Sequence, residues 1–356
     1  MVIISKIEHW TENLELIRPY RIAYETISSV ENHFVLLETD EGAFGIGSAS
    51  PSPEVTGESI EDCQAALDDN LDSLLLNHDI EHWKHLCHQI QISMSKTPAA
   101  RAACDIALHD LAAKLVELPL VELLGQVHHS MPTSITIGIQ SIEESLAEAE
   151  EYLGRGFRIL KLKTGVSWEA DVECLQKIRE KVGRDVKIRV DANQGYSAGE
   201  YEKFSDQTNW LDIELVEQAL PATSDKKMLD LPERIRMRSV ADESLVNEED
   251  AARLAQSPRA FGIFNIKLMK CGGITPALQI AHMAEKAGID LMWGCNDESI
   301  VSITAALHAA FSSSATKYLD LDGSLDLAKD VVKDGFFLEN GKMELTANPG
   351  LGVNLI

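Results

Sequence analysis

The sequence lacks the features of an exported, membrane-spanning or disulfide-stabilised protein. Its six cysteines lie far apart without a CxxC pair, and a chain of 356 residues is long enough to build a core without disulfides. The first residues, MVIISKIEHW, contain too short an apolar run for a signal peptide, and no stretch approaches the roughly 20 apolar residues of a membrane span. We therefore expect reduced thiols and a cytoplasmic protein with no membrane partner.

Positive charge is also scarce. The chain carries 32 Lys and Arg against 57 Asp and Glu, a formal net charge of −25. This charge repels polyphosphate backbones, so we expect no nucleic-acid partner. The same acidity suits divalent cations, although most of the acidic residues need only keep the surface soluble. The content of 45% hydrophobic and 25% charged residues is typical of a globular enzyme.

Three patterns follow one another along the chain. Residues 1–50 alternate in short apolar runs with a turn at residues 40–42, which predicts an antiparallel sheet. Residues 58–125 show apolar positions at helical spacing. After Pro132, short β-branched runs alternate with helical segments, which predicts a parallel sheet. We predict eight such strands, at residues 133–139, 157–163, 186–191, 212–217, 237–242, 261–267, 289–294 and 317–322.

Eight parallel strands separated by helices close into a (β/α)8 barrel, so the predicted fold class is α/β. We predict an α+β capping domain at residues 1–125 and a barrel domain at residues 126–324. Residues 325–356 do not continue the repeat, and we expect this segment to pack back on the capping domain and complete it. The repeat of about 25 residues indicates a barrel rather than a solenoid.

Charged residues end five successive predicted strands, 25 to 28 residues apart: Lys163, Asp191, Glu217, Asp242 and Lys267. In a barrel all five ends open on the carboxyl rim, where the active sites of barrel enzymes are built. Three neighbouring carboxylates raise one another's pKa unless a cation lies between them. An all-oxygen set without His or Cys favours Mg²⁺, with Mn²⁺ as the alternative, over zinc.

The lysines provide the second half of the predicted site. Lys161 and Lys163 lie two apart on one strand and therefore share a face, so we predict that each lowers the other's pKa. Lys267 faces them across the barrel mouth. A substrate carbon held between them would have a base on one side and an acid on the other. A metal ion would stabilise the enolate charge that results.

These residues resemble the enolase superfamily, in its muconate-cycloisomerase-like subgroup. The resemblance covers nearly all 356 residues. It rests on six motifs: KLK (161–163), DAN (191–193), VEQ (216–218), ADES (241–244), NIKLMKCGG (265–273) and the helix AACDIALHDLAAKLVELPLVELLG (102–125).

The resemblance implies an enolase-like, modified TIM barrel that binds one Mg²⁺ per subunit. The metal ligands would be Asp191, Glu217 and Asp242. Lys163 and Lys267 would be the two acid/base catalysts, with Lys161 beside the substrate carboxylate and Asn193 beside the metal ligands. Cycloisomerases, o-succinylbenzoate synthases, acylamino-acid racemases and dipeptide epimerases share this set, so it does not identify the substrate.

Residues near the last strands discriminate better. Asp320 and Asp322 lie two apart at the end of the eighth predicted strand, where an uncompensated carboxylate pair on one face would suit a substrate α-ammonium group. The pair resembles the feature by which dipeptide epimerases hold the amino terminus of the substrate. A solvated turn or a second metal ligand is the alternative. Thr136 matches a substrate-contacting position of the same enzymes, and Cys295 and Asn296 follow the seventh strand as further pocket candidates.

The first-domain loop RPYRIAYE (18–25) bears on the second residue of the dipeptide. In epimerases acting on Ala-Glu an arginine pairs with the glutamate side chain, and Glu25 aligns with that arginine. The loop is otherwise largely apolar, at Tyr20, Ile22, Tyr24 and Ile27. We therefore expect Ala joined to a neutral or hydrophobic residue, with a cationic residue as the next choice and Glu disfavoured. Arg18 or Arg21 could still reach inward.

We thus predict a homo-oligomeric isomerase, a dipeptide epimerase that transfers a proton at the α-carbon of the carboxy-terminal residue. Two alternatives remain: a lyase, cycloisomerase or N-acylamino acid racemase using the same metal and lysines, and a non-catalytic binding protein. His82, His85 and His88 stand at helical spacing within the capping domain, and we do not expect them to bind zinc.

Overall fold

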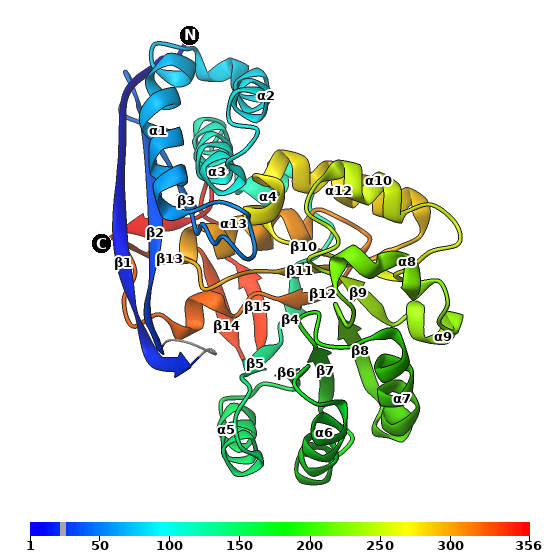
Figure 1. Cartoon of the computed structure of the whole chain (residues 1–356). Coiled ribbons are helices and arrows are strands. Elements are labelled where there is room, and N and C mark those ends of the chain that lie inside the picture. The colour runs from blue at the N-terminus through cyan, green and yellow to red at the C-terminus, as the bar shows by residue number, and fades with distance from the viewer. Residues whose placement is uncertain (22–25) are drawn as a thin grey trace.

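The computed structural model describes residues 1–21 and 26–356, which form a capping domain beside a barrel (Figure 1). The capping domain begins with a three-stranded antiparallel sheet in the order β1-β2-β3. Its strands are β1 (Ile4–Arg21), β2 (Thr26–Thr39) and β3 (Phe44–Ala49). The turn predicted at residues 40–42 joins β2 to β3, so the predicted antiparallel hairpin is confirmed.

Helices follow this sheet. They are α1 (Ile60–Leu75), α2 (Trp83–Ser93), α3 (Pro98–Leu115) and α4 (Leu120–Leu124), with the 3₁₀ turn η1 (Ile80–His82) before α2. Two of them, α1 and α3, pack against the sheet. Ser59 and Asp62 form a capping box at the start of α1, and Pro98 opens α3, where its fixed φ suits a first turn. Gly47 of β3 allows α3 to approach closely, because a Cβ at this position would overlap the backbone of Ala103.

Eight parallel strands form the second sheet, in the sequential order β5 to β12. They are β5 (Ile135–Ile137), β6 (Ile159–Lys163), β7 (Lys187–Asp191), β8 (Ile213–Glu217), β9 (Ser239–Ala241), β10 (Ile263–Ile266), β11 (Asp290–Gly294) and β12 (Thr316–Asp320). Each overlaps one of the eight predicted strands, so the barrel prediction is confirmed. The strands are shorter than the apolar runs that predicted them, since the last residues of several runs already turn into the rim loops.

Helices surround the barrel (Figure 1). The longer ones are α5 (Ile142–Gly154), α6 (Trp168–Val182), α7 (Ala198–Thr208), α10 (Glu248–Leu254), α12 (Ile274–Ala287) and α13 (Ile300–Phe311). Short helical segments fill the remaining connections: η2 (Asn209–Leu211), η3 (Ala222–Ser224), α8 (Asp225–Met228), α9 (Glu233–Arg236), α11 (Leu268–Cys271) and η4 (Gly323–Asp326). None of the helices in the described residues combines the length and the apolar character needed to cross a membrane.

A small apolar layer lies inside the barrel, separate from the main core. It is formed by residues of four consecutive strands: Leu215, Val240, Ile263 and Met292. Because side chains alternate along a strand, residues two positions further on also face the interior. These are Glu217, Asp242, Asn265 and Gly294, so the polar strand ends lie directly above an apolar floor.

The barrel is not fully closed by a strand ladder. Between β12 and β5 the contact is an isolated bridge of Thr133 with Leu319, supported by a hydrogen bond from Ser134 N to Leu319 O (3.1 Å). The sequence before β5 therefore meets β12 through loops and side chains, and this seam lies beside Asp320 at the end of β12.

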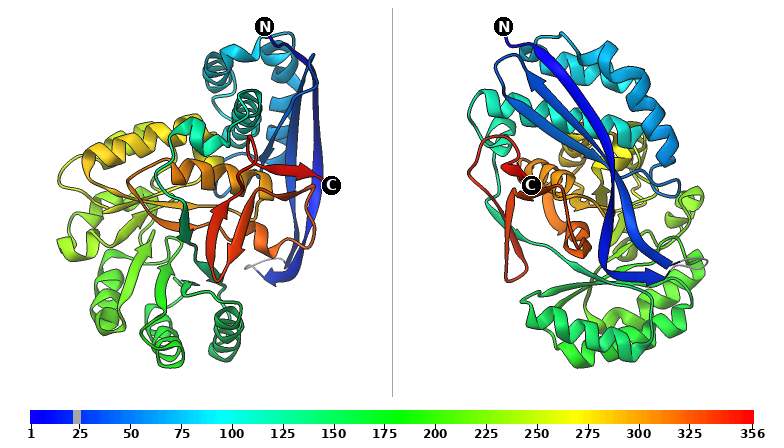
Figure 2. Two further views of the ribbon diagram at one scale, coloured as in Figure 1. Left: turned by 180° about the vertical axis from the view of Figure 1, so that it is seen from behind. Right: turned by 90° about the vertical axis from the view of Figure 1, so that its left-hand side faces the viewer.

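The C-terminal segment lies on the same side of the barrel as the N-terminal sheet (Figure 2). Two small antiparallel sheets form here, from β4 (Ser130–Pro132), β13 (Val332–Asp334), β14 (Phe336–Glu339), β15 (Lys342–Leu345) and β16 (Val353–Leu355). Gly350 N donates to Leu118 O (2.9 Å) and Leu351 N to Asp110 Oδ1 (2.8 Å) of the capping domain. The exact domain boundaries remain a prediction.

Candidate active site

The strand ends at the carboxyl rim bring the predicted site residues together. On adjacent strands, Lys163 lies opposite Asp191, and Asp191 lies opposite Glu217. Asp242 directly follows β9, and Lys267 follows β10. Since β6 and β10 are four strands apart in an eight-stranded barrel, Lys163 and Lys267 approach the mouth from opposite sides.

Lys161 is the centre of the buried network. Its Nζ lies 2.6 Å from Glu217 Oε2, 2.6 Å from Asp320 Oδ2 and 3.1 Å from Asp191 Oδ2. Burial lowers the pKa of Lys161, but the three carboxylates raise it well above its ordinary value. The predicted lowering by Lys163 is therefore wrong for this residue, because three opposite charges outweigh one like charge.

Each of the two predicted acid/base lysines contacts a predicted metal ligand. The side chain of Lys163 is about one-third exposed, and its Nζ lies 2.8 Å from Asp191 Oδ2 and 3.0 Å from Asn193 Oδ1. Lys267 Nζ lies 3.0 Å from Asp242 Oδ2. Burial lowers the pKa of Lys267, but Asp242 and Glu217 raise it above its ordinary value. The ammonium form of Lys267 is thus favoured, as an acid requires.

Lys270 is a buried partner of the site that the sequence reasoning missed. Its Nζ hydrogen bonds to the Asp242 carboxylate, to Asp242 O (2.6 Å) and to Asn265 O (3.2 Å). The short helix α11 places Lys270 three residues after Lys267, so both lysines reach the same carboxylate. Lys270 is the second lysine of the motif NIKLMKCGG, but the sequence alone predicted no role for it.

The three predicted metal ligands carry unequal pKa shifts. Burial raises the pKa of Asp191 and of Asp242, but the neighbouring lysines lower both to values below the ordinary range. Burial and the charge of Asp191 raise the pKa of Glu217 to about 8. Glu217 Oε1 also accepts a hydrogen bond from Asn265 Nδ2 (2.6 Å). Three buried carboxylate groups that repel one another are a donor set suited to a divalent oxygen-binding cation.

Asp320 and Asp322 are both buried, but they do not form the uncompensated pair on one face that was predicted. Asp320 ends β12 and is already matched by Lys161 and by Ser134 Oγ, which donates to its Oδ1 (2.6 Å). Asp322 has left the strand, with φ −94° and ψ −9°, and accepts from Thr136 N (2.8 Å). Burial and the charges of Asp320 and Asp326 raise the pKa of Asp322 to about 7.

The pocket candidates after β11 lie next to this pair. Cys295 Sγ is 3.3 Å from Gly323 N and 3.3 Å from Asp320 O, so it packs against the Asp320–Gly323 turn. Asn296 N donates to Glu298 Oε1 (2.7 Å). Burial raises the pKa of Glu298 to about 7. Sequence reasoning missed Glu298, because a single acid in a rim loop follows no periodic pattern.

The first-domain loop is only partly described. Glu25, Ile22 and Tyr24 lie outside the described residues, as do the side chains of Tyr20, Arg21 and Ile27. Arg18 is described, and its guanidinium binds Glu148 (3.0 Å) and Glu151 (3.0 Å) of α5. The Arg18 guanidinium is therefore paired with two acidic side chains of α5.

Comparisons with known proteins agree with this geometry. Residues 6–125 match the mandelate racemase/muconate lactonizing enzyme N-terminal domain family, and residues 144–356 match the enolase C-terminal domain-like family. The chain is 58% identical over 353 residues to the L-Lys-D/L-Arg epimerase of Desulforapulum autotrophicum, covering 99% of both chains. It is 36% identical over 360 residues to the L-Ala-D/L-Glu epimerase of Bacillus subtilis, covering 98% of this chain and 96% of the relative.

A solved structure gives the same assignment. The dipeptide epimerase of Methylococcus capsulatus, crystallised with Mg and the dipeptide L-Arg-D-Lys, superposes with a TM-score of 0.96 at 50% sequence identity, covering 99% of both chains. The chain therefore belongs to the enolase superfamily and, within it, to the dipeptide epimerases, which are isomerases.

Proposed function

We propose that the protein is a Mg²⁺-dependent epimerase of cationic dipeptides, which inverts the α-carbon of the carboxy-terminal residue. The observation that carries the proposal is the rim arrangement, in which carboxylates from three adjacent strands stand between lysines on opposite sides. In this proposal Asp191, Glu217 and Asp242 hold the metal. When bound, the Mg²⁺ would act as a Lewis acid on the substrate carboxylate.

The lysines of the chain move the proton. One of the pair Lys163 and Lys267, as the neutral amine, takes the proton from Cα, and the C–H electron pair passes into the substrate carboxylate as an enolate. The other, as the ammonium, returns a proton to the opposite face of the same carbon, so the two lysines exchange protonation states in each turnover. Lys161 would lie beside the substrate carboxylate and offset part of its charge.

The preference for a neutral second residue is not supported, and a cationic substrate is favoured instead. The relatives at 58% and 50% identity are both named as epimerases of a Lys-Arg dipeptide. In this chain, acidic residues crowd the rim after β11 and β12: burial and neighbouring acids raise the pKa of Asp322 to about 7 and of Asp326 to about 6. A substrate with an ammonium group and cationic side chains would relieve that repulsion.

A dipeptide library in D₂O tests the proposal. The protein with saturating Mg²⁺ is incubated with L-Arg-L-Lys, L-Lys-L-Arg, L-Ala-L-Leu and L-Ala-L-Glu, and deuterium at the carboxy-terminal α-carbon is followed by NMR. We expect the cationic dipeptides to react with the highest kcat/KM. A higher kcat/KM for L-Ala-L-Leu would refute the cationic specificity, and absence of exchange with every dipeptide would refute the epimerase function itself.

A further inference from the structure

The turn that carries Lys267 is held from outside the barrel by helix α3 of the capping domain. After Lys267 the chain runs through α11, Gly272 and Gly273 into α12. Arg101 Nη2 of α3 donates to Cys271 O (3.3 Å) in this turn. The capping domain therefore contacts the same short segment that places one of the two proposed acid/base groups.

Asp105 makes the stronger contact. Its Oδ1 accepts from Ile274 N (2.6 Å) and Thr275 N (3.1 Å), the first backbone amides of α12. The N-cap residue of this helix is Gly273, which has no side chain with which to cap it. A carboxylate from another domain thus takes the role that a Ser, Thr or Asp normally plays within the same segment.

The glycines of the turn fit closely around these two side chains. A Cβ on Gly272 would come within 2.7 Å of Arg101 Nε, and one on Gly273 within 2.6 Å of Asp105 Oδ1. Both glycines have positive φ, 94° and 114°, which disfavours other residues as well. The turn is therefore shaped to receive the capping domain at this place.

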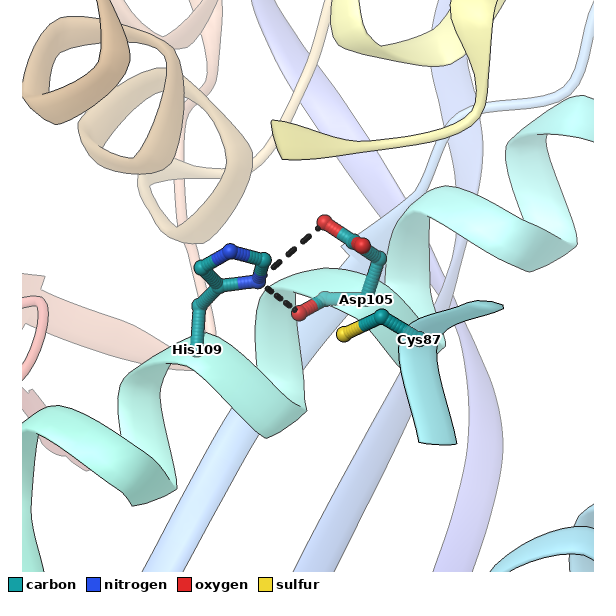
Figure 3. A group of neighbouring side chains, drawn as sticks. All are labelled: Cys87, Asp105 and His109. Atoms are coloured by element: carbon teal, nitrogen blue, oxygen red, sulfur yellow. Dashed lines mark hydrogen bonds and ion pairs between the residues drawn. The ribbon is translucent and has the colours of Figure 1, made fainter. Parts of the chain in front are cut away.

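Asp105 is itself fixed in position. Figure 3 shows it beside Cys87 and His109, with His109 Nδ1 hydrogen bonded to Asp105 O (2.7 Å) and 3.2 Å from Asp105 Oδ1. Among the described residues, this is the one group of three potential metal-binding side chains whose ligand atoms all lie within 4.8 Å of one another. His109 Nδ1 and Asp105 Oδ1 are already engaged by backbone groups of the protein, and burial raises the pKa of the Cys87 thiol well above its ordinary value. We interpret the group as packing that holds Asp105.

We propose that Asp105, assisted by Arg101, is a positioning residue for Lys267. The capping domain thereby fixes the position of the lysine on one face of the substrate. It does not fix the position of Lys163, which acts on the other face. Asp105 acts by fixing the start of α12 and the turn before it. Lys163 lies on β6, across the barrel, and contacts Asp191 and Asn193 instead. The inference rests on the proposed two-lysine epimerisation.

Proton transfer on each of the two faces of the substrate α-carbon can be measured separately in D₂O. A substrate isomer whose Cα proton is removed by Lys163 can regain a deuteron from Lys163, which labels it without inversion, whereas inversion requires Lys267. The Lys267→Ala variant identifies this isomer, because only this isomer should still exchange its Cα proton for deuterium when Lys267 is absent. For that isomer, the measured quantity is the ratio of inversion to exchange with retention, determined at saturating Mg²⁺ for wild type and variants.

Asp105→Ala is expected to lower this ratio by about tenfold or more, since a misplacement of about 1 Å can cost roughly 100-fold in rate. Asp105→Asn, whose side-chain oxygen can still accept from Ile274 N, should lower it less. Asp110→Ala is the matched control. Asp110 is also buried on α3 and accepts two backbone amides, Ile46 N (2.9 Å) and Leu351 N (2.8 Å), but it does not contact the Lys267 turn.

An unchanged ratio in Asp105→Ala, or an equal fall in Asp110→Ala, overturns the positioning role and leaves a general structural one. If Asp105→Ala does not fold, as judged by circular dichroism, Asp105→Asn and Arg101→Gln carry the test, and both must lower the ratio. Failure of the proposed function is distinct, because wild type itself would then exchange no dipeptide.

Discussion

Asp320 and Asp322 lie two residues apart in opposite electrostatic environments. The same substitution is therefore predicted to change the free energy of unfolding in opposite directions at the two positions. Asp322→Asn is expected to stabilise the metal-free protein at pH 8, while Asp320→Asn destabilises it. Both carboxyl groups are buried, with 6% and 4% of the residue exposed, so solvent screens neither effect strongly. Asparagine keeps an oxygen that can still accept from Thr136 N at position 322.

The sign follows from the pKa of each group. In the folded protein the pKa of Asp322 is raised from 3.8 to about 7, so the stability associated with the neutral acid is complete below pH about 4 and is lost as the pH rises to 7. Three pKa units correspond to about 4 kcal/mol, an upper estimate for the gain of Asp322→Asn at pH 8. The pKa of Asp320 is lowered by Lys161, so its contribution is present above pH about 4 and disappears in acid.

Urea unfolding in EDTA at pH 4 and pH 8 measures both effects. Asp320→Asn leaves Lys161 with one carboxylate fewer, and loss of one partner of a buried ion pair costs about 3 to 5 kcal/mol. Asp322→Asn should also lower kcat/KM for a cationic dipeptide, by about 30-fold or more, because a buried charge partner is worth at least about 2 kcal/mol. A loss of stability at pH 8 in Asp322→Asn, or a gain that is equal at both pH values, would refute this account of the strand end.

Three further outcomes are expected. Lys163→Ala and Lys267→Ala should each lower epimerisation by about 10²- to 10⁴-fold while retaining deuterium exchange for one isomer, and full epimerisation by either variant in a coupled polarimetric assay would contradict the assigned roles. Saturating Mg²⁺ should raise the free energy of unfolding by about 2.7 kcal/mol at 100 times its Kd, whereas a melting temperature that does not respond to Mg²⁺ or EDTA would argue against a metal site. Gly47→Ala should destabilise the protein by about 1 to 3 kcal/mol, because its Cβ would overlap Ala103 O, while Gly138→Ala, with no atom within 4 Å of the new Cβ, should be close to neutral in the same denaturant titration.

Much of the fold and the core of the site could be predicted from the sequence, because both depend on periodicity. The alternation of β-branched runs and helical segments placed all eight barrel strands. The charged residues recur with the same period as the strands, so a barrel brings their ends to one rim whatever the details of packing. Lys163, Asp191 and Glu217 consequently lie side by side in the sheet.

The remaining features depend on distances between segments that no local pattern encodes. Lys161 was expected to respond to its sequence neighbour Lys163, but three carboxylates from other strands decide its pKa. Asp320 and Asp322 were expected to share a face, yet the strand ends at Asp320 and the next residues turn. Glu298 lies in a rim loop, where an acidic residue looks like ordinary surface. The role of Glu25 stays a prediction.

The hydrogen bonds that join the two ends of the chain have a consequence for biosynthesis. Asp110 receives the amide of Leu351, 241 residues later, and Leu120 N donates to Gly350 O. At a translation rate of roughly 5 to 20 residues per second, the ribosome releases these two partners on the order of 10 to 50 s apart. During this interval the nascent capping domain lacks the C-terminal segment that contacts it. The uncovered surface can then bind chaperones or begin to aggregate.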